Sequence, residues 1–184
     1  MKNLILLLLF IPLISFSQDF RKMSFGQSVE ELKETYPEYV FITENDMGMN
    51  IFSHTDVVGG IEATVAYLFV DNKLSSGFYY FDRTNIFKSD DDRYKDFKSI
   101  SLILNDKYEM QENNNWHDDA FKDDPTRNAF SLAMGYVDFS EMHSTDKVLI
   151  NHTLLRTDGV YTHIVGYIAP SFGQLMEKKI DSDF

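Results

Sequence analysis

The sequence predicts an α+β protein in which helices pack on one face of an antiparallel sheet. Two helix-start signals are each followed by several segments rich in β-branched and aromatic residues. Asn, Asp and Gly separate these segments, and such residues favour tight turns between neighbouring strands. Because the same order of elements occurs twice, we expect two tandem units of one helix and an antiparallel meander, within about 18–86 and 87–184.

The first unit begins with a helix-start signal in residues 28–37. Ser28 and Glu31 have the spacing of a capping box, and Pro37 is typical of the residues that follow a helix. The segments after it are rich in β-branched and aromatic residues, which are typical of strands. We expect strands within 39–46, 47–56, 60–71 and 73–83.

The second unit begins with a longer helix in residues 89–110. Ser89 and Asp92 repeat the capping pattern, and apolar residues recur at helical spacing after them. A polar stretch then runs to residue 128. We expect strands near 129–139, 147–157 and 160–169, and a short terminal helix in 171–180.

The N-terminal residues predict export. Lys2 precedes the apolar run Leu4–Ile14, and Ser15-Phe16-Ser17 has the small-x-small pattern of a cleavage site. The alternative is a membrane anchor, but a spanning helix needs about 20 apolar residues. We therefore expect a signal peptide at 1–17 and a single mature domain at 18–184, periplasmic or extracellular and without a transmembrane span.

The composition restricts the classes of partner. The chain has no cysteine, so its stability must come from an apolar core, and 16 Phe with 10 Tyr supply large side chains for one. A formal net charge of −12 repels phosphate backbones, so nucleic acid is not an expected partner. A protein partner of unknown identity fits this composition better.

Three segments together resemble the β-lactamase-inhibitor-protein-like superfamily of small bacterial envelope proteins. They are "FGQSVEELKETYP", "ATVAYLFVDNKLSSGFYYFD" and "YKDFKSISLILNDKYE". The resemblance implies tandem units of a helix and a four-stranded antiparallel sheet, which bind proteins through a sheet face and loops. Members include inhibitors and outer-membrane assembly components and share no catalytic motif, so the resemblance implies a fold and no single function.

Turn residues predict the register of the first hairpin. A two-residue turn at Asn72-Lys73 places Tyr67 opposite Phe78, and it places Glu62 opposite Arg83 as a favourable charge pair. In this register Tyr67 and Phe78 face the helices. Tyr79 and Phe81 then lie on the other, exposed face with Glu62, Thr64 and Ala66.

The second hairpin has a stronger turn signal, Asp158-Gly159. A two-residue turn there places His163 opposite Leu154 and His152 opposite Val165. Both histidines then share one face with Arg156, Tyr161 and Tyr167. We interpret the two histidines as residues of a strand surface.

Two functional hypotheses follow. The first is an exported, non-catalytic binding protein of the bacterial cell envelope, since Tyr and Arg are typical of interface hot spots. Its expected partner-binding residues are Tyr79, Phe81, Arg156, Tyr161, His163 and Tyr167. An equally weighted alternative is that other parts of the chain cover this face.

The second hypothesis is a metal-dependent or other hydrolase that uses His152 and His163, with His143 or His117 as a further zinc ligand. The sequence contains no HExxH motif, nucleophile elbow, phosphate-binding loop or dinucleotide-binding loop. We therefore expect no catalytic residue, no cofactor and no metal site, and we favour the binding hypothesis.

Overall fold

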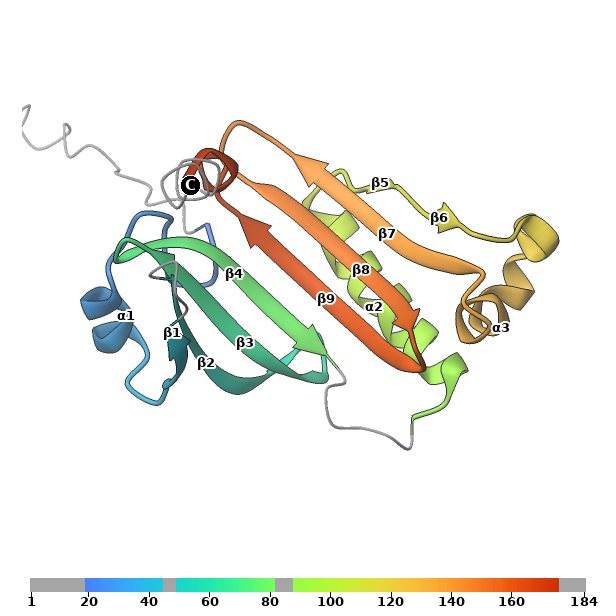
Figure 1. Ribbon diagram of the computed structural model, residues 1–184, viewed down its shortest axis with the longest axis horizontal. Helices are drawn as coiled ribbons and strands as arrows, with labels where there is room; N and C mark the ends of the chain where they lie inside the picture. The colour runs from blue at the N-terminus through green and yellow to red at the C-terminus, as the bar shows by residue number, and fades with distance from the viewer. Residues whose placement is uncertain (1–18, 45–48, 82–87, 176–184) are drawn as a thin grey trace, which may run out of the picture.

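A computed structural model describes residues 19–44, 49–81 and 88–175. The protein is α+β, as expected, and the described residues form nine strands of one antiparallel sheet (Figure 1). The strand order is β1-β2-β3-β4-β9-β8-β7-β5, and β6 pairs with β7 beside this path. The last strands of the two halves of the chain, β4 and β9, pair at the centre of the sheet.

The bounds of the elements are as follows. The helices are α1 (Val29–Thr35), α2 (Asp90–Lys107) and α3 (Asn128–Ala133), with 3-10 turns η1 (Asp119–Phe121) and η2 (Pro125–Arg127). The strands are β1 (Val40–Glu44), β2 (Met49–Val58), β3 (Ile61–Val70), β4 (Lys73–Phe81), β5 (Gln111–Glu112), β6 (Asn115–Trp116), β7 (Val137–Ser144), β8 (Leu149–Thr157) and β9 (Val160–Ile168).

Both predicted helix starts are confirmed. Ser28 caps α1 and forms the full capping box with Glu31, whose carboxylate accepts from the backbone N–H of Ser28 at 2.7 Å. Ser89 caps α2 by accepting from the backbone N–H of Asp92 at 3.1 Å. Local hydrogen bonds that depend on neighbouring residues thus fix where each helix begins.

One predicted strand is wrong in its first half. Residues 128–133 form α3, and the strand β7 begins only at Val137. Ala129 and Leu132 are buried at helical spacing, and Gly135 follows the helix with a positive φ of 71°. Of the expected terminal helix in 171–180, residues 172–175 form a helical turn, and the remainder lies outside the described residues.

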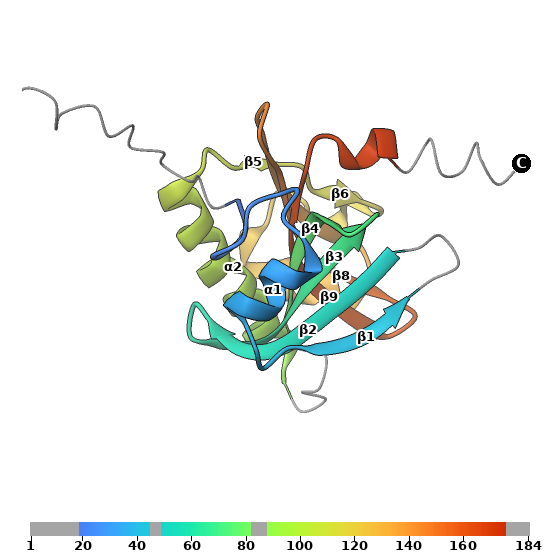
Figure 2. The same cartoon turned by 90° about the vertical axis from the view of Figure 1, so that its left-hand side faces the viewer.

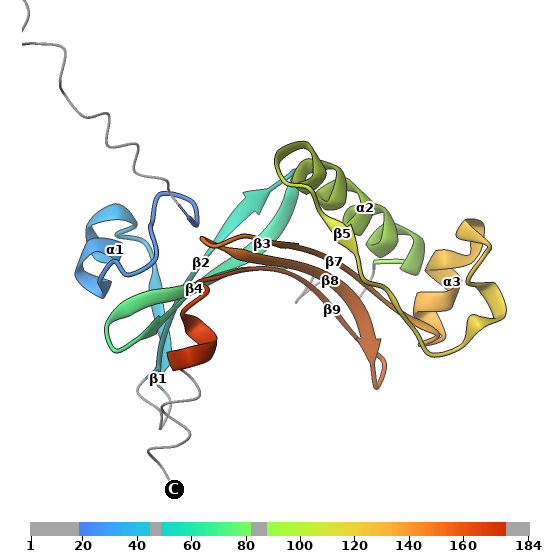
Figure 3. The ribbon, with the colours of Figure 1, turned by 90° about the horizontal axis from the view of Figure 1, so that it is seen from above.

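The helices α1, α2 and α3 pack on the same face of the sheet, as the sequence predicts (Figure 3). Leu32 of α1 packs with Tyr67 and Phe69 of β3. Ile100 of α2 packs with Ala63 of the same strand, further along the same face. This face, here called the helix-covered face, therefore carries the apolar core.

The opposite face, here called the open face, carries none of these helices. The sheet is strongly twisted, and in the view along its β1 edge both α1 and α2 lie to one side of it (Figure 2). On the other side lies the C-terminal turn, in which Leu175 N–H donates to the Ser171 carbonyl at 3.0 Å. The described helices include none that is both long and apolar enough to cross a bilayer.

The register of the β3–β4 hairpin differs from the prediction by one residue. The turn is Asp71-Asn72, with φ angles of 51° and 61°, and Val70 pairs with Lys73. A bulge then displaces β4 so that Val65 faces Tyr79. The predicted pair of Glu62 with Arg83 lies outside the described residues, because Arg83 does.

This shift exchanges the two faces of β4, because side chains alternate along a strand. Tyr79 and Phe81 lie on the helix-covered face, paired with Val65 and Ala63. Phe78 lies on the open face instead. The prediction that Tyr79 and Phe81 lie on the exposed face as partner-binding residues is therefore wrong, because both lie on the helix-covered face.

The register of the β8–β9 hairpin is confirmed. His152 pairs with Val165, Leu154 pairs with His163, and Asp158-Gly159 forms the turn. The two histidines share one face, as predicted. That face is the helix-covered one, so the interpretation of these histidines as surface residues is wrong.

Candidate functional site

The structure buries part of the partner-binding set expected from the sequence. Phe81 and His163 are each only 2% exposed, so neither presents a surface to a partner. The other four residues are half-buried, and each packs or bonds within the fold. These four are Tyr79, Arg156, Tyr161 and Tyr167.

Tyr79 and Tyr167 belong to an aromatic cluster centred on Phe20. The Phe20 ring lies 5.0 Å from that of Tyr79 and 5.4 Å from that of Tyr167, measured between ring centroids. Burial raises the pKa of Tyr79 to about 12, and it also raises the pKa of Tyr167. Both rings therefore fasten the N-terminal segment to the sheet.

Arg156 and Tyr161 attach helices to the end of the β8–β9 hairpin. The Arg156 guanidinium donates to the carbonyl of Ala133 at the end of α3, and the Tyr161 hydroxyl donates to Asp90 at the start of α2. The Arg93 guanidinium of α2 also lies over the Tyr161 ring, 4.5 Å from its centroid. Arg156 and Tyr161 therefore hold α3 and α2 against the β8–β9 hairpin.

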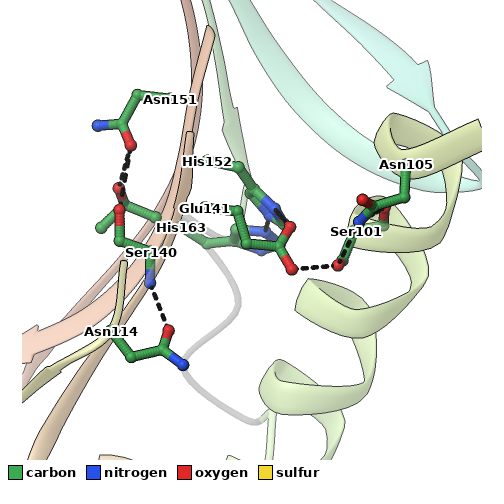
Figure 4. A network of polar contacts seen from close by, with 9 residues as sticks. Ser101, Asn105, Asn114, Ser140, Glu141, Asn151, His152 and His163 are labelled. Carbon is green, nitrogen blue, oxygen red and sulfur yellow. Dashed lines mark hydrogen bonds and ion pairs between the residues drawn. The ribbon is translucent and has the colours of Figure 1, made fainter. Parts of the chain in front are cut away.

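The two histidines form part of a buried polar chain between α2 and the sheet (Figure 4). Ser101 of α2 donates to one oxygen of Glu141 at 2.5 Å, and the other oxygen lies 3.2 Å from Nδ1 of His152. His152 Nε2 then lies 3.0 Å from Nε2 of His163. Glu141, His152 and His163, here called the histidine chain, are at most 4% exposed.

Burial dominates the electrostatics of the histidine chain. Burial lowers the pKa of His152, and the bond to Glu141 only partly opposes this effect. Burial and the neighbouring His152 lower the pKa of His163 well below its ordinary value. Burial would raise the pKa of Glu141, but hydrogen bonds from His152 and Ser101 outweigh it, so this pKa is lowered.

The other two candidate zinc ligands belong to separate contacts. His117 Nε2 lies 2.9 Å from a carboxylate oxygen of Asp138, and His143 Nδ1 lies 3.2 Å from the carbonyl oxygen of Glu109. Within residues 19–44, 49–81 and 88–175, no three His, Asp or Glu side chains are arranged to hold a metal ion. The histidines singled out in the sequence therefore do not form one site.

A pocket of about 370 Å³ lies instead on the open face. Its floor is the middle of β3 and β4, one wall is formed by β1 and β2, and the C-terminal turn contributes the other. None of the described residues that line it is charged. They are Ile42, Met49, Ile51, Thr64, Ala66, Leu68, Phe78, Tyr80 and Phe172.

The pocket adjoins an exposed edge of the sheet. Among the described strands, β1 pairs only with β2, so it forms an edge of the sheet. Val40 and Phe41 on this edge are 63% and 49% exposed, and the next residue, Ile42, lines the pocket. The apolar pocket and the free edge thus form one continuous surface.

The predicted register put Phe78 and Tyr80 on the helix-covered face because it lacked the bulge at Ser75, whose extra residue exchanges the faces of β4. The two central residues of a tight hairpin turn of the common primed type have positive φ, which Asp and Asn tolerate better than Lys does. This preference favours Asp71-Asn72 over Asn72-Lys73, but moving a two-residue turn by one position shifts the pairing by two residues and leaves the faces of β4 unchanged. The bulge at Ser75 has no comparable signal in the sequence.

Comparisons with known proteins found no match among family models, curated proteins or solved structures. The resemblance to the β-lactamase-inhibitor-protein-like superfamily therefore stays a prediction. The site must be interpreted from its own chemistry.

Proposed function

We propose that this chain is an exported, non-catalytic binding protein of the bacterial cell envelope, which holds a protein partner on its open face. The observation that carries the proposal is the uncharged pocket of about 370 Å³ on that face. Binding pockets are concave and mostly apolar, with a few polar groups that orient the occupant. Thr64 and Tyr80 are the polar residues of this pocket.

The free edge of β1 supports a protein as the occupant. An exposed strand edge can add a strand from a partner, while a neighbouring pocket receives apolar side chains and gives specificity. Ile42 belongs to both features. Phe78 and Tyr80 add aromatic rings, which are enriched in protein interfaces. A small apolar molecule would use the pocket but would gain nothing from the edge.

The expected location supports the same class of function. Export rests on the signal-peptide pattern in 1–17, which lies outside the described residues. The net charge of −12 favours partners that are neutral or basic at the contact. The order of helix and strands in each half is also compatible with the superfamily that the sequence resembles.

The alternative of a hydrolase that uses His152 and His163 has no support from the geometry. His152 is 0% exposed and His163 is 2% exposed, so both rings are buried within the described part of the chain. The Nε2 atoms of the two rings are directed at each other, and Nδ1 of His152 is directed at Glu141. We therefore do not assign a reaction to them.

Site-specific photo-crosslinking tests the proposal. A photoreactive phenylalanine analogue replaces Tyr80 on the open face, or Leu102, which is 71% exposed on the outer side of α2. The two proteins are irradiated in intact cells of the source organism. We expect a discrete protein adduct from position 80 and none from position 102, and a second change, Phe78→Ser, should remove the adduct.

Two results would contradict this proposal. Identical adducts from positions 80 and 102 would mean that the open face is not the binding surface. If position 80 gives no protein adduct while native mass spectrometry shows an apolar small molecule on the wild-type protein and not on Phe78→Ser, the pocket serves a small ligand and the protein-partner assignment is wrong.

A further inference from the structure

The histidine chain lies on the helix-covered face, so an inference from it is independent of the proposed function. The histidine chain is a buried polar connection between α2 and the central strands. Ser101 of α2 bonds Glu141 of β7, which bonds His152 of β8, which in turn bonds His163 of β9. In addition, the Phe97 ring of α2 stacks on the His152 ring with a centroid separation of 4.2 Å.

The bonding pattern fixes the tautomers of both neutral rings. The Glu141 carboxylate only accepts, so Nδ1 of His152 must donate to it. Nε2 of a neutral His152 is then an acceptor, and Nε2 of His163 must donate across the 3.0 Å contact. This leaves a lone pair on Nδ1 of His163, which is buried and has no hydrogen-bond partner among the described residues.

This arrangement has no place for an added proton. A proton on Nδ1 of His163 would create a buried donor without an acceptor, beside the rings of Phe81 and Phe97. A proton on Nε2 of His152 would face the N–H of His163. That ring would then have to move its own proton to the unpartnered Nδ1, so either route breaks a buried bond or leaves one unmade.

The charged groups around the histidine chain do not remove this penalty. Glu141 on β7 favours a positive His152, but Lys98 on α2 opposes it. Lys88, which lies just before α2, and His152 itself disfavour a positive His163. On β4, Phe81 packs against His163 with a ring-centroid separation of 4.6 Å. The Phe81 side chain offers no hydrogen-bond acceptor.

We propose that the histidine chain makes the attachment of α2 to the sheet acid-sensitive, so that acidification below neutral pH releases this helix before the rest of the fold opens. A free histidine takes up a proton near pH 6.5, whereas these two rings resist it while α2 is attached. The attachment is therefore fully stable above about pH 6.5 and weakens as the pH falls below that value. Release would uncover the apolar side of β8 and β9.

The pH dependence of unfolding tests the proposal with the full chain. Between about pH 6.5 and 5, the equilibrium constant for unfolding should rise by up to tenfold per pH unit for each histidine that gains a proton only on unfolding. His163→Gln removes one such group and retains an amide that can donate to His152. Its unfolding equilibrium constant should therefore rise less steeply with falling pH than that of the wild type, by up to a factor of ten per pH unit. His143→Gln, at a half-buried histidine outside the chain, should keep the wild-type slope. His54, whose pKa is also lowered by burial, contributes equally to all three proteins.

Two further measurements need only the wild-type protein, so they remain decisive if His163→Gln does not fold. Nitrogen NMR of the rings at pH 6 should show both neutral, with the proton of His152 on Nδ1 and that of His163 on Nε2. Hydrogen exchange during acidification should reach the amides of α2 before those of α1. A cationic His163 at pH 6, an unchanged slope in His163→Gln, or simultaneous exchange of α1 and α2 would each overturn the proposal.

Discussion

Phe20 and Gly77 show how closely single residues are fitted in the apolar core of the helix-covered face. Phe20 is 1% exposed and lies directly over Gly77 of β4. A Cβ atom added at Gly77 would stand 2.1 Å from the Phe20 ring, far inside any real contact. Gly77 is therefore required by the close approach of the N-terminal segment to the sheet.

The first prediction concerns this contact. Gly77→Ala should lower the free energy of unfolding by about 2 kcal/mol, because overpacking a filled core commonly costs 1–3 kcal/mol. Chemical denaturation followed by fluorescence measures the change. Gly173→Ala is the control, since an added Cβ there meets no atom within 4 Å. Equal stability of both variants would show that Phe20 does not occupy this position.

The residues of the candidate site were only partly predictable from the sequence. The pairing of His152 with Val165 follows from an Asp-Gly turn and is confirmed. The burial of His152 does not follow from local sequence, because His152 is covered by α2, which lies 45 or more positions earlier in the chain. Histidine is intermediate in burial preference, so residue type alone could not decide between core and surface.

The elements were more predictable than their register. N-cap serines and helical periodicity located α1 and α2, because these signals arise from interactions within a few residues. The faces of β4 depend on the bulge that follows the Asp71-Asn72 turn, because one extra residue in a strand exchanges its faces. The short helix α3 was missed because its apolar residues are equally compatible with a buried strand.

Asn72 links two elements through this turn. Its side-chain oxygen accepts from the backbone N–H of Val29 at 3.3 Å, and its amide donates to Glu30 at 3.1 Å, both in the first turn of α1. Its φ of 61° lies in the left-handed region. The β3–β4 turn therefore also positions the start of α1.

A pair of substitutions separates these two roles of Asn72. Asn72→Gly and Asn72→Ala both remove the contacts with α1, but only Ala is strained at a positive φ. Asn72→Ala should therefore be less stable than Asn72→Gly by about 1 kcal/mol in urea denaturation. Should the two variants unfold at the same urea concentration, the turn does not have the positive φ described for it.

At the scale of the whole molecule, the helices divide the sheet into two unlike faces. The helix-covered face holds the aromatic core and the histidine chain, and the open face holds the pocket formed with Phe172. The fold class and the position of helices on one face were predictable from the order of elements. Which aromatic residues lie on which face was not, because it depends on the register of β4.

The absence of cysteine from the chain allows this division to be measured directly. Single cysteines can be introduced at adjacent or nearby strand positions that face opposite ways. Thr64→Cys and Thr162→Cys lie on the open face, and Ala63→Cys and Val165→Cys lie beneath the helices. A thiol reagent then reports the accessibility of each position in the folded protein.

Thiol labelling of these four variants is the most direct test of the central claim that the face carrying Phe78 and Tyr80 is uncovered. The account predicts rapid labelling at positions 64 and 162 in native protein, and labelling at positions 63 and 165 only when denaturant unfolds it. Protection at 64 and 162, or rapid native labelling at 63 and 165, would contradict it.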